Sequence, residues 1–204
     1  MQPQANVALN TNRWTMRDFI TLAIFNVVML IILTACNMMI VHPIWHLIGG
    51  GVVALINGPV YMVLASKIGK PGVLFFNSII LGLYYTAFGF IYFLMILAVF
   101  GALCELAMRG SGTYKKAARN AIGYGIYYVG YSLCGFVPLI LFREQYMSIL
   151  EQSYTPAKLE EMLYYYSTPS MVIIMCVVSF VGSAAGCLAG SALLKKHVRK
   201  AKLV

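Results

Sequence analysis

The chain has 204 residues, of which 61% are hydrophobic and only 10% are charged. A soluble domain carries roughly a quarter charged residues, mostly on its surface, so this composition excludes a chain whose whole surface faces water. The length fits one membrane domain. The net charge of +9 comes from short basic clusters beside apolar runs, which indicates contact with anionic lipid or an acidic partner and no nucleic acid.

Continuous apolar runs predict an all-α integral membrane protein, because the strands of a membrane barrel alternate every second residue. We predict a bundle of six transmembrane helices, at about 19 to 41, 45 to 66, 71 to 88, 90 to 108, 118 to 142 and 169 to 194. Only Gly89 marks a turn between the third helix and the fourth. The alternative, one kinked helix of about 34 residues, would reach roughly 50 Å and exceed a 30 Å hydrocarbon core.

The basic residues predict the orientation. With six spans and both termini in the cytoplasm, 13 of the 15 Lys and Arg residues lie on the cytoplasmic side, and only Arg143 and Lys158 lie outside. This asymmetry agrees with the positive-inside rule. We therefore divide the chain into a cytoplasmic N-terminal segment at 1–18, a membrane domain at 19–194 and a basic cytoplasmic tail at 195–204.

One sizeable segment, 143–168, lies outside the predicted spans, on the outer side. It contains four of the six acidic residues: Glu144, Glu151, Glu160 and Glu161. The stretch "TPAKLEEMLYYY" predicts a short helix with Thr155 as N-cap and Pro156 at its first position. Either this helix covers the bundle through the face made of Leu159, Met162, Leu163 and Tyr166, or its tyrosines form a belt at the lipid interface.

Polar side chains recur inside the predicted spans. Tyr124, Tyr128 and Tyr131 are spaced by four and three residues, which places them on one helix face. Buried phenols need hydrogen-bond partners, so this face points to other helices or to a cavity. Each polar group taken alone fits an interhelical hydrogen bond. Together they favour an outward-facing pocket, to which we add Asn57, Tyr84 and Tyr85.

The stretch "MMIVHPIWHLIGGG" joins the first two spans and contains His42, Trp45 and His46. These residues could form a metal site, a lid over a pocket or a plain turn. The predicted orientation places them on the outer side, so we favour a lid over the tyrosine-lined pocket. A bare metal ion fits poorly, because Pro43 separates the histidines and no cysteine or carboxylate is close in sequence.

The sixth span contains "GSAAGCLAG", in which Gly182, Gly186 and Gly190 are spaced by four residues. A helix face without side chains allows another helix to approach closely, and such faces stabilise helix pairs in lipid. The spacing predicts close packing but leaves open whether the partner helix belongs to this chain.

No HExxH, GxSxG or P-loop motif and no paired intramembrane acidic residues occur in the sequence, so an ATP-driven function requires ATPases on other chains. We predict no enzyme activity and no cofactor. Two alternatives stay open. One is a membrane enzyme acting on a lipid or isoprenoid through His42, His46 and Glu144, and the other is a structural membrane subunit.

The overall pattern resembles the S components of energy-coupling factor (ECF) transporters, and more closely their MptA-type group. The resemblance covers about Arg17 to His197 and rests on "NGPVYMVLASKIGKPGVLFF", "GLYYTAFGF", "ELAMRGSGTYKKAARNAIGYG" and "GSAAGCLAGSALLKKH". It implies a prokaryotic plasma-membrane protein that binds a micronutrient at its outer face. Its implied partners are a transmembrane T component and two cytoplasmic ATPases.

The resemblance also implies site residues. Substrate would lie between the outer halves of the later helices, under the loop between the first two. His42, Trp45 and His46 would be lid residues, and the tyrosine stripe and the outer segment, with Tyr166, would form the walls. The T component would contact a small-xxx-small motif on the first helix, here degenerate as Ala23 and Val27, and the glycine face of the sixth helix could share this role. A vitamin-like molecule would stack on the tyrosines, whereas haem or another iron chelate could take His42 or His46 as an axial ligand.

Overall fold

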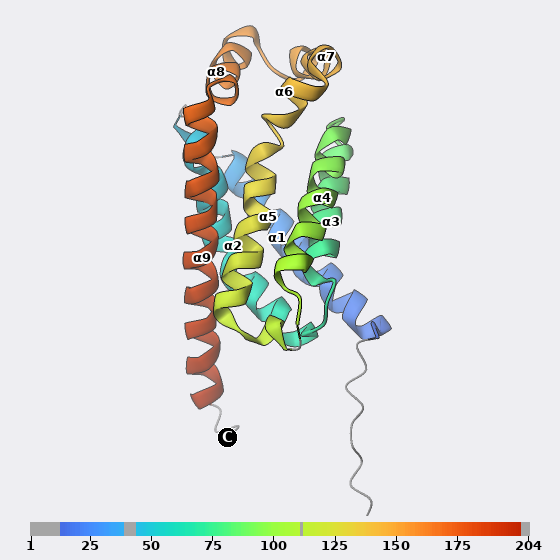
Figure 1. Cartoon of the computed structure of the whole chain (residues 1–204), viewed down its shortest axis with the longest axis vertical. Coiled ribbons are helices and arrows are strands. Elements are labelled where there is room, and N and C mark those ends of the chain that lie inside the picture. Colours follow the sequence, from blue (N-terminus) through green and yellow to red (C-terminus); the bar gives the residue numbers. More distant parts are fainter. Residues whose placement is uncertain (1–12, 39–43, 111, 201–204) are drawn as a thin grey trace, which may run out of the picture.

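The computed structural model describes residues 13–38, 44–110 and 112–200. These residues form nine α-helices and one short 3-10 helix, with no strand among them, which confirms the all-α prediction for this part of the chain. A bundle of upright helices makes up most of the molecule (Figure 1): α1 (Met16–Met38), α2 (Trp45–Ile68), α3 (Val73–Thr86), α4 (Ile91–Ala107), α5 (Ala117–Leu133) and α9 (Pro169–Lys200). Three short helices, which we call the arch, lie across one end: α6 (Val137–Leu141), α7 (Arg143–Ser153) and α8 (Pro156–Ser167).

Three helices are long and apolar enough to cross a membrane: α1, α2 and the part of α9 from Pro169 to Lys196. Helix α3 has 14 residues, and α4 and α5 have 17 each, fewer than the about 20 that a full span needs. The outward faces of the bundle are apolar. Ile31 in α1, Val99 in α4 and Ile173 in α9 are exposed by 63%, 60% and 63%, as suits contact with lipid.

The turn predicted at Gly89 is present. Helix α3 ends at Thr86 and α4 begins at Ile91, and Gly89 between them has a φ of +91°, which glycine adopts without strain. The predicted uninterrupted helix from 118 to 142 is wrong. Helix α5 ends at Leu133 and α6 begins at Val137, because Pro138 has no N–H to donate to the carbonyl of Cys134 and its ring crowds that turn.

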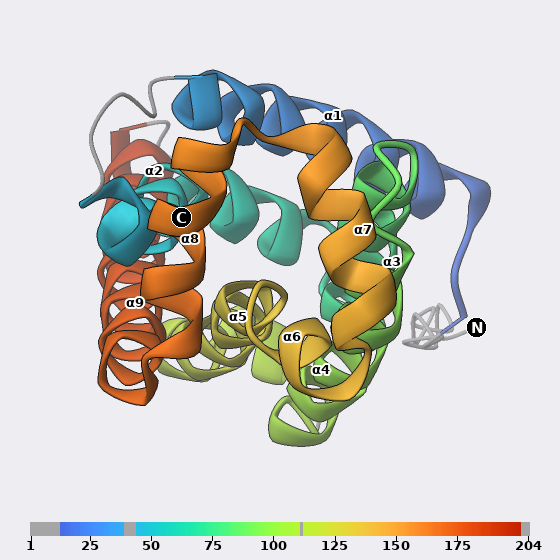
Figure 2. The same ribbon diagram turned by 90° about the horizontal axis from the view of Figure 1, so that it is seen from above.

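The 143–168 segment also differs from the prediction. Helix α8 begins at Pro156 with Thr155 as its N-cap residue, as predicted, although the Thr155 side chain makes no capping hydrogen bond. The sequence reading did not predict α7, which turns the segment into two helices joined at Tyr154. Seen from above, α7 lies over the α3 and α4 side and α8 over the α2 and α9 side (Figure 2).

Glycines bring α2 and α9 into close contact. A Cβ added at Gly186 would lie 2.7 Å from the carbonyl oxygen of Leu55, and one at Gly182 would lie 2.3 Å from that of Gly51. On the opposing helix, a Cβ at Gly58 would lie 2.4 Å from the carbonyl carbon of Gly186. Any side chain at these positions would push the two backbones apart, so both helices need glycine here.

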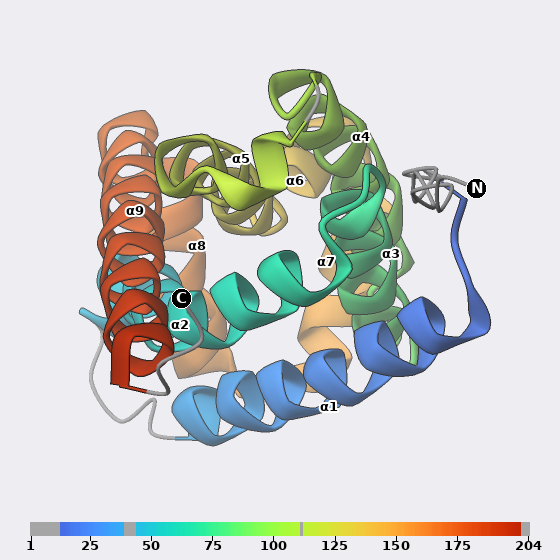
Figure 3. The same ribbon diagram turned by 90° about the horizontal axis from the view of Figure 1, so that it is seen from below.

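The end of the bundle opposite the arch, which we call the basic end, holds the start of α1 and the end of α9 (Figure 3). The Lys70 ammonium pairs with the Asp18 carboxylate, which links the α2–α3 connection to the first turn of α1. The Glu105 carboxylate in α4 accepts hydrogen bonds from the backbone N–H groups of Leu74 and Phe75 at the start of α3. These contacts hold α1, α3 and α4 together at the basic end.

Candidate functional site

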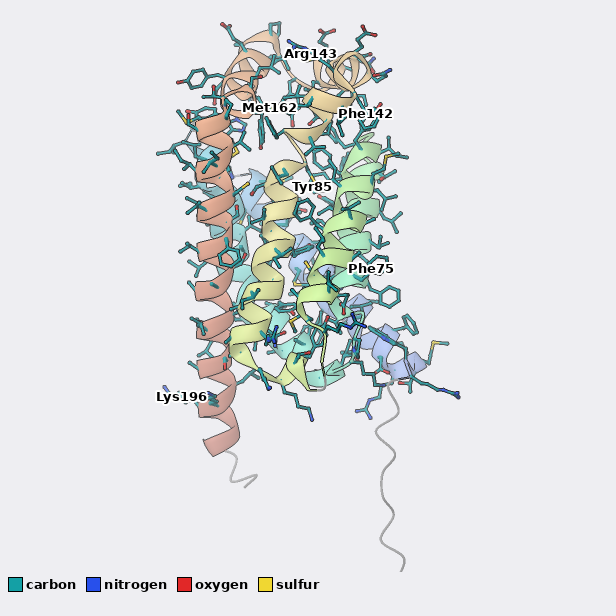
Figure 4. All side chains as sticks on the ribbon, viewed as in Figure 1. Phe75, Tyr85, Phe142, Arg143, Met162 and Lys196 are labelled. Carbon is teal, nitrogen blue, oxygen red and sulfur yellow. The ribbon has the colours of Figure 1, made fainter. Side chains whose placement is uncertain are left out.

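A cavity of about 510 Å³ lies between the arch and the bundle. Its size falls within the range of small-molecule sites, about 300–1,000 Å³. Figure 4 labels Met162 in the arch and Tyr85 in the bundle below it, and both residues line the cavity. Five of the residues predicted from the sequence line it together: Trp45, His46, Tyr85, Tyr131 and Tyr166.

Aromatic rings form much of the cavity wall. They come from six helices (α2, α3, α4, α5, α7 and α8), from the turn before α4 and from the connection between α7 and α8. The eight aromatic residues that line it are Trp45, Tyr85, Phe90, Phe93, Tyr131, Tyr146, Tyr154 and Tyr166. The ring of Tyr166 lies on the backbone of Gly135, where an added Cβ would come within 2.3 Å of the ring. A glycine between α5 and α6 is therefore what allows Tyr166 of α8 to reach the cavity.

Helix α7 is anchored by its apolar face. Tyr146 and Leu150, one turn apart, are buried and form a small apolar cluster with Met162 of α8, against which Phe90 and Phe93 pack. Burial raises the pKa of Tyr146 above that of an ordinary phenol, so its hydroxyl is neutral at physiological pH. The arch is thus a packed roof with neutral aromatic groups on its inner side.

Hydrogen-bonding groups lie on the bundle side of the cavity. The hydroxyls of Tyr85 and Tyr131 are 2.9 Å apart, and the amide of Asn37 donates to the Tyr85 hydroxyl over 3.4 Å. Because one hydrogen joins the two hydroxyls, the other hydroxyl hydrogen is left for a further acceptor. The hydroxyls of Ser132 and Ser179 form a second pair at 2.7 Å. A bound molecule would meet a polar edge here and rings elsewhere.

Charged and titratable groups enter the cavity from α2 and α8. The Nε2 atom of His46 lies 3.6 Å from Oε1 of Glu161, and the His46 ring stacks on Tyr165 with centroids 5.6 Å apart. Lys158 also lines the cavity, one turn before Glu161, and forms no ion pair with any described residue. These three groups set the charge that a bound molecule would meet.

Three predicted residues lie in the structure but do not line the cavity. The amide of Asn57 donates to the carbonyl oxygen of Met29 over 3.1 Å and to the Tyr128 hydroxyl over 3.4 Å, so these two side chains hold α1, α2 and α5 together. The Tyr84 hydroxyl is 2.8 Å from that of Thr34 in α1. His42 lies outside the described residues.

Sequence reasoning missed Asn37, Tyr146, Lys158 and Glu161 as cavity residues. The spacing of Tyr146 and Leu150 by four residues could have indicated the buried face of α7. Glu144, considered as an enzyme residue, is exposed on α7 and does not line the cavity. No comparable pattern marks Asn37, which stands near the end of an apolar helix.

The residues expected to contact a T component fall into two groups. Gly182, Gly186 and Gly190 pack against α2 of the same chain, so we assign them to packing within the molecule and no longer to a partner. Ala23 and Val27 are exposed on α1, where Val27 is 55% accessible.

The chemistry of the cavity suits binding through rings and hydrogen bonds. Within residues 13–38, 44–110 and 112–200, no three His, Cys, Asp or Glu side chains gather in a way that could hold a metal ion. His46 is a described cavity residue that could coordinate a metal brought by the bound molecule itself, and Met38, Met162 and Met175 also line the cavity.

Long apolar helices with lipid-facing side chains define an all-helical integral membrane protein. Residues 16–200 match the model of the Trep_Strep family, whose description is "hypothetical bacterial integral membrane protein". The chain belongs to this family. No curated protein and no solved structure matches it.

Proposed function

We propose that the chain is the substrate-binding S component of an ECF-type importer in the bacterial plasma membrane. In this role it captures a micronutrient, either a vitamin-like compound or haem or another iron chelate, in the cavity beneath the arch. It hydrolyses no ATP itself and depends on a T component and two cytoplasmic ATPases. The observation that carries the proposal is the 510 Å³ cavity, roofed by α7 and α8 and lined by eight aromatic residues.

The distribution of charge supports an orientation with the arch outside the cell. Figure 4 labels Arg143 in the arch and Lys196 toward the opposite end of the molecule. Basic residues near the helix ends at the basic end include Lys67, Lys115 and Lys116. With six spans, this end faces the cytoplasm by the positive-inside rule, and the cavity opens toward the nutrient. The three shorter helices α3, α4 and α5 then cross a locally thinned bilayer.

The exposed face of α1 supports a contact with the T component. Ala23 is a small residue on this face in the half of α1 nearer the basic end, and Val27 follows one turn later. A helix can approach most closely where side chains are small, so the partner would meet α1 at Ala23. The glycine face of α9 is already occupied by α2 and takes no part.

Co-purification tests the proposal. The tagged full chain is expressed together with the T component and ATPases of its own bacterium and is solubilised in mild detergent. We expect all three partners to be retained in a fixed ratio and ATP hydrolysis to drive uptake in proteoliposomes. If the chain purifies alone and instead converts a lipid or isoprenoid to a new product, it is a membrane enzyme and the proposal is wrong.

A further inference from the structure

The arch concentrates negative charge in a basic protein. Four of the six acidic residues of the chain lie in α7 and α8, whereas these helices contain two of its 15 basic residues. The approach to the cavity is therefore acidic, although the chain as a whole carries a net charge of +9. Such a local excess raises the concentration of cations at an entrance and lowers that of anions.

Glu161 is the carboxylate among the residues that line the cavity, and Lys158 is the ammonium group. Glu161 is half-buried, and its partner His46 carries charge only when protonated. At pH 8, well above the ordinary pKa of about 6.5 for histidine, the imidazole is mostly neutral and adds no positive charge beside this carboxylate. Lys158 is exposed on the preceding turn and lies beyond 4.0 Å of Glu161, so it does not form an ion pair with this carboxylate.

The aromatic rings of the cavity also favour a cation over an anion. The face of an aromatic ring carries partial negative charge, which attracts an organic cation and repels an anion. Eight aromatic residues line the cavity, and the stacked pair His46 and Tyr165 places rings beside Glu161. Lys158 offsets the charge of Glu161 in the lining, so the aromatic wall and the acidic excess of the arch together favour a flat, positively charged molecule.

We infer that the cavity binds an aromatic organic cation, whose charge lies near Glu161 and whose ring stacks on the tyrosines. This inference rests on the proposed function, because it assumes that the cavity is the cargo site. It favours the vitamin-like cargo over haem, since the two propionates of haem would enter an acidic mouth. The polar edge at Tyr85 and Tyr131 would take a hydrogen-bond acceptor of the same molecule.

Equilibrium dialysis with three probes of similar size tests the inference at pH 8. The probes are 1-methylquinolinium, neutral quinoline and anionic 2-naphthoate, each with the full chain in detergent. We expect the quinolinium cation to bind most tightly and 2-naphthoate least. Glu161→Gln should weaken binding of the cation on the order of tenfold, while Lys158→Gln should strengthen it by removing a like charge.

Glu160→Gln is the matched control for charge. Glu160 is the neighbouring residue, is exposed and does not line the cavity. The same loss of charge there should change cation binding less than twofold in 0.15 M salt, because exposed charges are screened. An equal effect of both Glu variants would show general attraction and overturn a contact at Glu161.

Two further results would overturn the inference without removing the proposed function. If 2-naphthoate binds most tightly and Lys158→Gln weakens it, the cavity takes anions and remains a cargo site. If none of the three probes binds up to millimolar concentration, the cavity does not bind aromatic organic cations. The association with the T component and ATPases is tested separately by co-purification.

Discussion

Nε2 of His46, in the first turn of α2, lies 3.6 Å from Oε1 of Glu161 in α8. The same imidazole stacks on Tyr165 and meets the edge of Tyr166 with centroids 6.1 Å apart. One side chain of the bundle therefore contacts three residues within two turns of α8: Glu161, Tyr165 and Tyr166. These contacts hold α8 against the first turn of α2 beside the cavity.

Replacing His46 should loosen α8. The contact with Glu161 and the ring contacts together stabilise the packing of α8 on the bundle by about 1 kcal/mol, so His46→Ala should speed amide hydrogen exchange in α8 by roughly fivefold. Exchange in α9 should not change. Hydrogen exchange with mass spectrometry measures both, and Lys158→Gln serves as a control on the same face of α8. If the exchange rate in α8 is the same in His46→Ala as in the unmodified chain, the imidazole does not stabilise the position of α8.

The contact between α2 and α9 predicts a strong effect on stability. Gly186→Leu should destabilise the chain by about 3 kcal/mol or more, because the new side chain meets the Leu55 backbone. Ala189 is exposed on the same helix, so Ala189→Leu should leave the unfolding temperature nearly unchanged. Thermal unfolding in detergent measures both variants. Equal unfolding temperatures would contradict the close helix contact.

The hydroxyl pair of Tyr85 and Tyr131 predicts a smaller effect. Tyr85→Phe removes the hydrogen bonds with Tyr131 and Asn37, which should lower the free energy of unfolding by about 1–2 kcal/mol. Tyr92→Phe is the matched control, since the Tyr92 hydroxyl makes no hydrogen bond with any described residue and its ring stacks on Phe142. The two variants should therefore differ clearly in a denaturation series, and similar stabilities would count against the pair.

The exposed face of α1 predicts where a T component binds. Ala23→Leu should reduce the amount of T component that co-purifies with the chain by several-fold, because the larger side chain keeps the helices apart. Ala35 is also exposed on α1 but lies nearer the arch, and Ala35→Leu should retain the partner. If both variants retain the partner, the contact lies on another face of the chain.

The sequence predicted the helical class and much of the cavity for identifiable reasons. Tyr131 and Tyr166 could be found because a phenol inside an apolar run needs a polar partner. The same reasoning also selected Asn57 and Tyr128, which form a hydrogen bond with each other between helices, and spacing along one helix does not distinguish these two outcomes. Only the packing of α5 against α2 separates residues that face the cavity from those that face each other.

Other features depended on contacts distant in sequence. The partner of the glycine face became clear only with α2 in place, because Gly51 and Gly58 lie more than a hundred residues away from α9. Helix α7 was missed because its apolar positions, Tyr146 and Leu150, stand among charged residues in a segment of low hydrophobicity. Lys158 and Glu161 became cavity residues because α8 turns back over the bundle.

Native mass spectrometry of the protein as purified, with an absorbance spectrum of the same sample, tests the central claim most directly. We predict one small organic molecule bound per chain without ATP, and its loss when the Glu161→Gln variant is purified in the same way. A vitamin-like cargo gives a small organic mass and no Soret band, whereas haem gives both its mass and that band. A chain that carries no small molecule, even after incubation with an extract of its own growth medium, would contradict the claim that this cavity captures a nutrient.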